Sequence, residues 1–274
     1  MKRFLLFLFA LALLCTGVTA QTAAYRTDRN IAYRDAAGDG YVDSLCRLDI
    51  YYPTDAKGFP TVVWFHGGGL TGGRRDIPQA LCDKGFAVVG VDYRLAPRVK
   101  VADCVADAAA AAAWVVKNIA SYGGDPRLIF IAGHSAGGYL TSMIGLDKRW
   151  MAPYGIDPDT AFAALIPYSG QVVTHFARRR EMGIPDTQVV VDDMAPLNYI
   201  RPDCPPILIL SGDREREMLG RYEENAYFWR MMQVAGHPDV GIREFDGFDH
   251  GNMPQAGHYV AVRYIRDFVK KRER

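Results

Sequence analysis

A serine flanked by glycines is the strongest chemical signal in the 274-residue sequence. The stretch Gly133-His134-Ser135-Ala136-Gly137 is a G-x-S-x-G motif that follows an apolar run and precedes a helix-like segment. In that context a sharp turn exposes the serine hydroxyl, and the first amides of the following helix face any anion formed there. The alternative is a glycine-rich turn with a capping serine, but the flanking strand and helix favour a nucleophile.

A serine hydroxyl becomes a nucleophile only beside a base. His250 is our candidate because it follows the last expected strand in a loop that carries glycines on both sides. The other histidines have less suitable positions. We expect His237 in a surface turn, His258 at the start of the C-terminal helix and His175 in a polar excursion of the chain.

The base in turn needs a carboxylate that fixes its tautomer and stabilises its charged form. Asp213 is our candidate, since Ser211-Gly212-Asp213 directly follows an expected strand. Asp246 is the second candidate. Both Asp246 and Asp249 lie so close to His250 in the chain that they would rarely reach the correct ring nitrogen.

A glycine run after an early strand could supply the donors that an acyl-transfer intermediate requires. In His66-Gly67-Gly68-Gly69 the amides have no side chains in their way, so they can approach a developing oxyanion closely. We expect the amides of Gly68, Gly69 and Ala136 to form this oxyanion hole, and His66 to brace the loop. A phosphate-binding loop is excluded because no Gly-Lys-Ser/Thr follows.

Together these motifs resemble those of the hormone-sensitive-lipase-like branch of the α/β-hydrolases, which is related to bacterial feruloyl and acetyl xylan esterases. The matching segments, in the matching order, are residues 66–69, 92–97 (DYRLAP), 133–138, 212–213 and 249–250. The resemblance implies a serine carboxylesterase with a partial cap and without a metal or cofactor. Its implied substrate is a small-molecule or carbohydrate ester.

Two other functions remain open at this point. An amidase, peptidase or formamidase would use the same fold and the same residues on a different bond. A non-catalytic binding protein is the more distant alternative, because a fold alone does not give a function.

The elements that must position these residues alternate between strand-like and helix-like segments. Strands are expected at residues 45–52, 61–65, 86–91, 128–132, 161–166, 207–210 and 240–245, and helices at 101–121, 139–146, 223–235 and 258–269. Such alternation predicts an α/β fold with a mainly parallel central sheet and helices on both faces. We expect one catalytic α/β-hydrolase domain over residues 21–274.

A polar stretch at residues 171–203 interrupts this alternation and predicts a small cap or lid. It carries Arg178, Arg179 and Arg180, which we expect on a solvated face. Holding an acidic substrate is the alternative role for these arginines.

The charge balance bears on possible partners. The chain has 32 Lys and Arg against 31 Asp and Glu, a formal net charge of +1. This balance provides no global field for nucleic acid or for an anionic membrane surface.

The N-terminus reads as a secretory signal peptide over residues 1–20. Lys2 and Arg3 precede an apolar run at residues 4–14, and Val18-Thr19-Ala20 supplies a small-residue cleavage site. The run is too short to span a bilayer, so no stable membrane insertion is expected. The sequence therefore predicts a secreted or periplasmic protein, whereas a lipid anchor on Cys15 is disfavoured by the bulky Leu14 before it.

The cysteines beyond the signal are Cys46, Cys82, Cys104 and Cys204. An oxidising compartment could pair them, or they could be small buried apolar residues. Their spacing does not resemble a zinc site.

Overall fold

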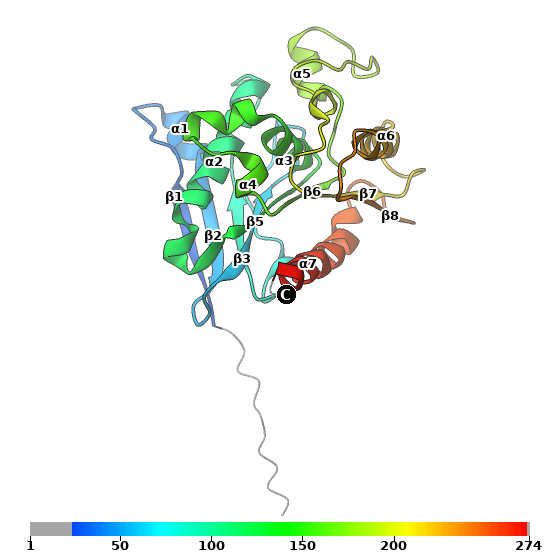
Figure 1. Cartoon of the computed structure of the whole chain (residues 1–274). Coiled ribbons are helices and arrows are strands. Elements are labelled where there is room, and N and C mark those ends of the chain that lie inside the picture. Colours follow the sequence, from blue (N-terminus) through cyan, green and yellow to red (C-terminus); the bar gives the residue numbers. More distant parts are fainter. Residues whose placement is uncertain (1–23, 273–274) are drawn as a thin grey trace, which may run out of the picture.

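The computed structural model describes residues 24–272 and places them in an α/β fold around a single sheet (Figure 1). The signal peptide expected at residues 1–20 lies outside the described part. The eight-stranded sheet has the order β1-β2-β4-β3-β5-β6-β7-β8. Its strands are β1 (Tyr25–Ala32), β2 (Arg47–Pro53), β3 (Phe59–Phe65), β4 (Ala87–Val91), β5 (Gly124–His134), β6 (Ala164–Tyr168), β7 (Ile207–Gly212) and β8 (Val240–Phe245).

The strands from β3 to β8 pair in parallel, whereas β2 pairs antiparallel with both β1 and β4. The mainly parallel sheet agrees with the sequence prediction. Its consequence for function is that β3, β5, β6, β7 and β8 all end at the same edge, where ligands bind in open α/β sheets.

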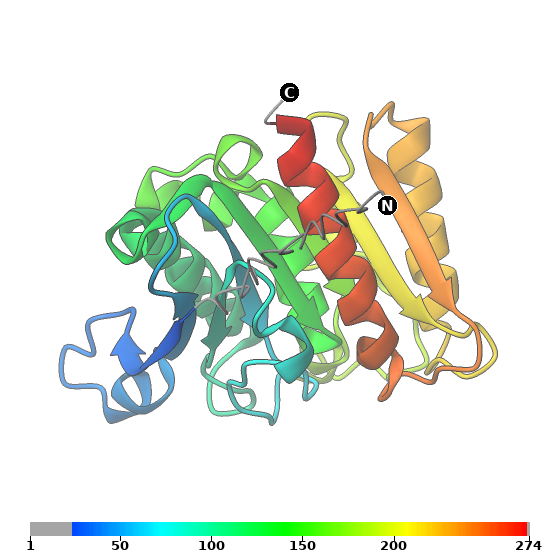
Figure 2. The same ribbon diagram turned by 90° about the horizontal axis from the view of Figure 1, so that it is seen from below.

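Helices cover both faces of the sheet. On one face lie α2 (Val101–Tyr122), α3 (Ala136–Leu146) and α6 (Arg221–Val234), and α7 (Met253–Arg272) crosses the other (Figures 1 and 2). Strand β5 feeds both layers because successive side chains point to opposite faces. Ile129 and Ile131 join the α2–α3 side, and Phe130 packs against Phe268 of α7 on the other.

The N-terminal part differs from the prediction. Residues 45–52 were expected to form one strand, but Leu45 ends helix α1 (Gly40–Leu45) and β2 begins at Arg47. The Asp39 carboxylate caps α1 by accepting the N–H groups of Tyr41 and Val42. Strand β1 was not predicted, since it is a largely polar edge strand.

Residues 171–203 leave β6 and return to β7 above the carboxyl ends of the parallel strands (Figure 1). They contain the short helix α5 (Phe176–Glu181) and a 3-10 turn at Pro196–Tyr199; another short helix, α4 (Pro158–Ala161), lies before β6. The Tyr139 hydroxyl of α3 donates to the carbonyl of Met194 at 2.9 Å, and the carboxylate of Glu181 accepts the N–H of Val101 at 2.6 Å. Both contacts tie the segment to the helical layer.

The arginine triplet in this segment is only partly on a solvated face. Arg180 is exposed and pairs with Asp186, but Arg179 is buried. The Arg179 guanidinium donates to the carbonyls of Asp186 and Gln188 at 2.7 and 2.6 Å, so it holds the segment's own loop together.

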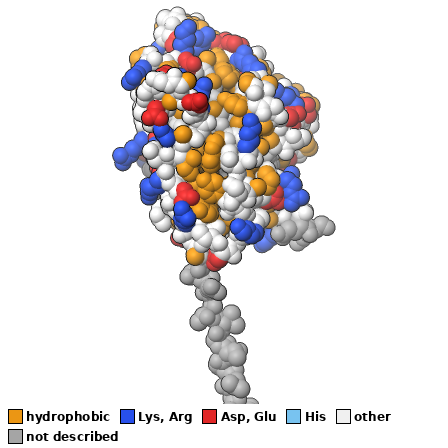
Figure 3. Space-filling view, turned by 90° about the vertical axis from the view of Figure 1, so that its left-hand side faces the viewer, with side chains coloured by type: hydrophobic (Ala, Val, Ile, Leu, Met, Phe, Trp, Pro, Cys, Tyr) orange, Lys and Arg blue, Asp and Glu red, His pale blue; other side chains and the backbone are white. Residues whose placement is uncertain are grey.

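Charges of both signs are interspersed on the β1 side of the molecule, around a band of apolar side chains (Figure 3). None of the helices within residues 24–272 combines the length and the apolar character needed to cross a membrane.

Candidate active site

Ser135 stands at the turn between β5 and α3 with a backbone conformation that side chains rarely adopt, φ 55° and ψ −112°. Its N–H donates to the carbonyl of Tyr168 at 2.8 Å, which holds the strained turn against β6. A Cβ at Gly137 would lie 2.6 Å from the carbonyl carbon of Phe65, and one at Gly133 would lie 2.6 Å from that of Gly137. The glycines are therefore required for β3, β5 and α3 to meet at the serine.

His250 reaches Ser135 as the sequence predicted. It lies in the loop between β8 and α7, and its Nε2 is 2.9 Å from Ser135 Oγ. The ring is 19% exposed, so solvent and a ligand can approach this side of the pair.

The carboxylate on the other ring nitrogen belongs to Glu217 and not to Asp213. His250 Nδ1 lies 2.8 Å from Glu217 Oε2. The prediction that Asp213 contacts His250 is wrong, because its carboxylate accepts the N–H groups of Gly247 and Glu215 at 2.7 and 2.8 Å. Asp246, the second candidate, does not bond the His250 ring either.

The reason is a turn that directly follows β7. The N–H groups of Arg216 and Glu217 donate to the carbonyl of Asp213, so the chain folds back on itself. This return brings the longer Glu217 side chain under the end of β7, where the N–H of Gly212 donates to its Oε1 at 2.9 Å. Asp213 faces outward instead and fastens the His250 loop.

Glu217 is held as a carboxylate by its neighbours. Its side chain is only 1% exposed, and the hydroxyl of Ser169 also donates to Oε1. Burial opposes ionisation, but the hydrogen bonds from His250 and Ser169 outweigh it and lower the pKa of Glu217 to about 2. The group facing His250 Nδ1 is therefore a full negative charge at neutral pH.

The glycine run after β3 lies against the serine. A Cβ at Gly67 would be 3.5 Å from Ser135 Cβ, while Gly68 and Gly69 adopt positive φ values of 111° and 64°. His66 stacks on Tyr93 with 4.4 Å between ring centroids and its Nδ1 is 2.6 Å from the carbonyl of Gly67. His66 thus braces the loop, which brings its first glycine, Gly67, up to Ser135.

Ala136 is the first residue of α3, so its N–H has no acceptor within its own helix. The expected oxyanion donors, Gly68, Gly69 and Ala136, accordingly belong to two segments that meet at Ser135.

Comparison with known proteins agrees with this geometry. The BD-FAE family model matches residues 48–163. A truncated carbohydrate esterase from gut microbiota superimposes with a TM-score of 0.71 at 19% identity, over 91% of this chain and 98% of that one. Propionate-bound esterase 2 of Thermogutta terrifontis gives a TM-score of 0.68 at 25% identity, over 90% and 94% of the two chains. This chain has the α/β-hydrolase fold.

Curated relatives are also similar to this chain in sequence. The probable carboxylic ester hydrolase LipM of Mycobacterium tuberculosis is 30% identical over 79% of this chain, and a probable isoprenylcysteine alpha-carbonyl methylesterase of Oryza sativa subsp. japonica is 41% identical over 76%. The chain spans about half the length of these two relatives, 54% of each.

The connection after β6 links Glu217 to α6 through hydrogen bonds. The Arg221 guanidinium donates to the carbonyl of Ser169, and Asn225 Nδ2 donates to that of Gly170 at 2.9 Å. Glu224 accepts the N–H groups of Val172 and Val173 at 2.9 and 3.0 Å. On its other side this connection touches the elbow, since a Cβ at Gly138 would lie 2.7 Å from Gly170 Cα.

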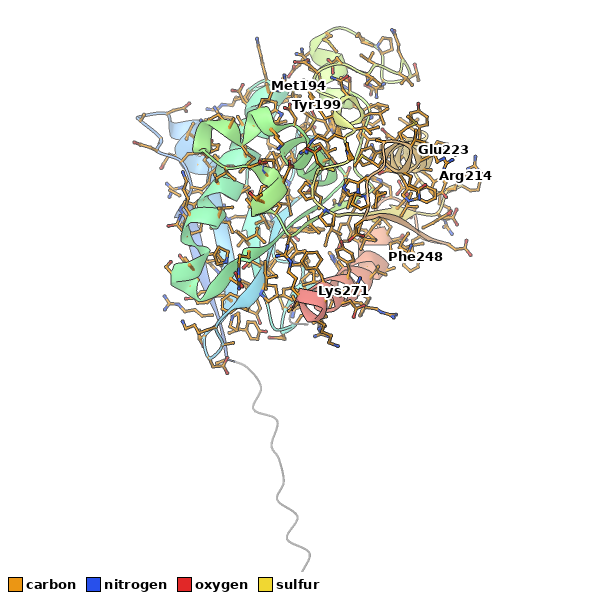
Figure 4. The ribbon with its side chains drawn as sticks, in the orientation of Figure 1. Met194, Tyr199, Arg214, Glu223, Phe248 and Lys271 are labelled. Atoms are coloured by element: carbon orange, nitrogen blue, oxygen red, sulfur yellow. The ribbon has the colours of Figure 1, made fainter. Side chains whose placement is uncertain are left out.

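A cavity of about 630 Å³ lies between residues 171–197 and the start of α6. Its lining includes Leu219, which follows Glu217 closely in the sequence. Its lining is mainly apolar and includes Val173, Phe176, Val191, Leu219 and Tyr227, with polar atoms from Gln171, Thr187, Glu223 and Glu224. Glu223 at its rim pairs with Arg214 at 2.7 Å (Figure 4).

The remaining histidines are occupied elsewhere. His237, expected at the surface, is buried, with Nε2 3.0 Å from the carbonyl of Cys204. Burial lowers the pKa of His175 to about 3 and that of His258 to about 4, so both are neutral packing residues at neutral pH.

Within residues 24–272, no three His, Cys, Asp or Glu side chains gather as a metal site would require. Cys46, Cys82, Cys104 and Cys204 are each unpaired and buried, which matches the second of the two expectations for them.

Sequence reasoning missed Glu217, Ser169 and a hydrogen bond between His134 Nε2 and the backbone carbonyl of His250. Glu217 and Ser169 have no local motif around them. The turn after β7 brings Glu217 to His250, and the connection after β6 brings Ser169 to Glu217.

Proposed function

We propose that this α/β-hydrolase is a serine carboxylesterase that acts through an acyl-serine intermediate. The observation that carries the proposal is the continuous hydrogen-bond chain from Ser135 Oγ through the His250 ring to Glu217, at 2.9 and 2.8 Å. Ester hydrolases and esterases among the relatives support the bond type.

Each residue has one role in this reaction. Ser135 Oγ attacks the ester carbonyl carbon while its proton moves to His250 Nε2, and Glu217 stabilises the resulting imidazolium. The amides of Gly68, Gly69 and Ala136 receive the negative oxygen. The bond to the alcohol then breaks as His250 returns the proton to the leaving oxygen. A water molecule then attacks the acyl carbon in the same way, with His250 taking its proton and returning it to Ser135 Oγ, and the carboxylic acid is released.

The test is replacement of Ser135 by Ala, with hydrolysis of p-nitrophenyl acetate as the measurement. The variant should keep only the residual catalysis of the binding site and oxyanion hole, roughly 10³–10⁴-fold over water. A fluorophosphonate should add one equivalent to the wild-type chain at Ser135 and none to the variant. Wild-type turnover by the variant would refute the proposal.

For the substrate, we propose esters with small acyl groups or acyl groups linked to polysaccharides. A bound propionate in one structural neighbour and the description of another as a carbohydrate esterase support this range. The cavity beside α6 supports it further. Tyr227 is half exposed and offers an aromatic face on which a sugar or aryl ring can stack, and the Glu223 carboxylate can accept hydrogen bonds from hydroxyls.

A matched panel tests the substrate proposal. We expect acetylated or feruloylated xylan fragments and short-chain nitrophenyl esters to be hydrolysed faster than palmitate esters or the corresponding amides. Tyr227→Ala should raise KM for the xylan fragments at least about threefold and leave nitrophenyl acetate kinetics unchanged, since Tyr227 is half exposed and lines only the cavity. Exclusive activity on long-chain esters or on amides would overturn the proposed class.

We further propose that the protein is exported, that residues 21–274 form its catalytic domain and that residues 171–203 serve as its cap. The signal-like composition of residues 1–20 and the position of α5 above the strand ends support these assignments. Mass spectrometry of the mature N-terminus, with fractionation of the producing cell, tests export and cleavage after Ala20.

A further inference from the structure

His134 precedes the nucleophile in the chain but makes its hydrogen bond to the loop that carries the base. Its Nε2 lies 2.8 Å from the backbone carbonyl oxygen of His250, a contact between residues 116 positions apart. The two rings are neighbours, with 4.9 Å between their centroids. A carbonyl oxygen only accepts hydrogen bonds, so this geometry requires the proton of His134 to be on Nε2.

The loop that His134 contacts is held at both of its halves. It connects β8 to α7 through residues 246–252, with Gly247 and Gly251 both exposed. From outside the loop, Asp213 fastens its first half by bonds to Gly247 and Phe248. The His134 ring fastens its second half at His250 itself.

We propose that His134 is a positioning residue. Its Nε2–H fixes the backbone of His250 so that the His250 ring spans Ser135 and Glu217. This inference rests on the proposed function of the Ser135–His250 pair. A displacement of about 1 Å at a reacting group can cost on the order of 10²-fold in rate, so one backbone hydrogen bond at this point carries a measurable share of catalysis.

The surroundings of His134 keep it neutral and suited to this task. Burial and, to a smaller extent, the adjacent His250 lower the pKa of His134 to about 4, against smaller opposite effects from the His250 carbonyl and Glu217. Arg221 is the other cation that acts on it, in the same direction as His250. A neutral ring donates one hydrogen bond without placing a second positive charge beside the imidazolium formed during the reaction.

The experiment compares His134→Leu with His134→Gln. Leucine keeps the volume without the donor, whereas glutamine can place an amide N–H near the position of the lost Nε2–H. For p-nitrophenyl acetate we expect His134→Leu to lower kcat by roughly 10- to 100-fold with KM within about twofold, and His134→Gln to restore kcat to within about threefold of wild type. Thermal unfolding of both variants checks that they are folded.

Wild-type kcat in His134→Leu would overturn the inference, as would an equal loss in both variants, which would indicate packing alone.

The wild-type protein provides a second test that needs no variant. In 15N-histidine-labelled protein, two-bond 1H–15N correlations should show His134 as the Nε2–H tautomer between pH 8 and pH 6, and an Nδ1–H tautomer or an imidazolium there would overturn it. If the proposed function itself is wrong, a different result shows it, namely full activity in Ser135→Ala.

Discussion

At the scale of single residues, the carboxylate that bonds His250 lies four positions after the one that the sequence suggested. Asp213 comes first and looks like the partner of His250, yet it bonds the backbone of the His250 loop. Glu217 lies four positions later and bonds the ring. The carboxylate that polarises the base and the carboxylate that supports its loop are therefore separate, and they can be tested separately.

Glu217→Gln should lower kcat by roughly 10³–10⁴-fold, because a neutral amide neither stabilises the imidazolium nor enforces the correct tautomer. Asp213→Asn should cost less than about tenfold, since it weakens support for the loop but leaves the His250–Glu217 pair in place. Steady-state hydrolysis of p-nitrophenyl acetate measures both. The reverse ranking would return the role of the acid to Asp213.

The same carboxylate should make stability depend on pH. The pKa of Glu217 falls from its ordinary 4.5 to about 2 on folding, so its contribution is fully present above about pH 5 and is lost as pH falls towards 2. We expect the difference in unfolding free energy between wild type and Glu217→Gln, measured with urea, to shrink steadily over that range. Glu215→Gln, whose side chain is exposed, provides the control. A difference that stays constant from pH 7 to pH 2.5 would contradict the assignment.

At the scale of elements, the site depends on strands and a helix that approach each other closely enough to exclude side chains. Strand β3, strand β5 and helix α3 meet at Gly133 and Gly137, and the backbone conformation of Ser135 follows from that contact. Ser135 is held partly exposed at the turn because these elements fix the backbone beneath it.

Gly137→Ala tests this contact. The new methyl group would overlap the backbone at Phe65, and overpacking of this kind costs about 3 kcal/mol, which lowers Tm by roughly 6–12 °C. The control is Gly241→Ala in β8, where the nearest atom to the added Cβ is Leu208 Cδ1 at 3.7 Å. Differential scanning calorimetry should find the control within about 2 °C of wild type. Equal melting temperatures for the two variants would show that the elbow tolerates a side chain.

At the scale of the whole molecule, the sequence was sufficient for the fold and for the parts of the site that lie in contiguous motifs. Ser135 and the 66–69 glycine run sit directly after strands, and His250 lies in the loop that follows β8; strands of a parallel sheet end at one edge. The apolar segments likewise predicted where β3 to β8 lie along the chain.

Positions that depend on tertiary contacts could not be predicted in this way. Glu217 reaches His250 only because the chain turns back at Asp213, and a turn of four residues between charged side chains has no distinctive pattern. Strand β1 is polar on most of its length, since it has one neighbour and little burial to satisfy. The burial of Arg179 depends on carbonyls seven and nine residues away.

The cysteines offer a test of the packed interior as a whole. Burial raises the pKa of Cys104 and Cys204 to about 12 and that of Cys46 to about 11, so these thiols are both inaccessible and protonated at pH 8. Iodoacetamide should leave Cys46, Cys82, Cys104 and Cys204 unmodified in the native protein and alkylate all of them after unfolding without reductant. Peptide mass spectrometry measures this. A requirement for reductant would reveal disulfides.

The connection after β6 has a practical consequence for altering substrate preference. Residues 169–173 bond Glu217 through Ser169, touch the elbow through Gly170 and line the cavity through Val173, so a replacement in this stretch disturbs contacts on which the site depends. Val189 and Val191 project from the far wall of the cavity, 72% and 47% exposed, and take no part in that junction. Mutant libraries that aim to change substrate selectivity should begin at these valines, because substitutions there leave the contacts of residues 169–173 in place.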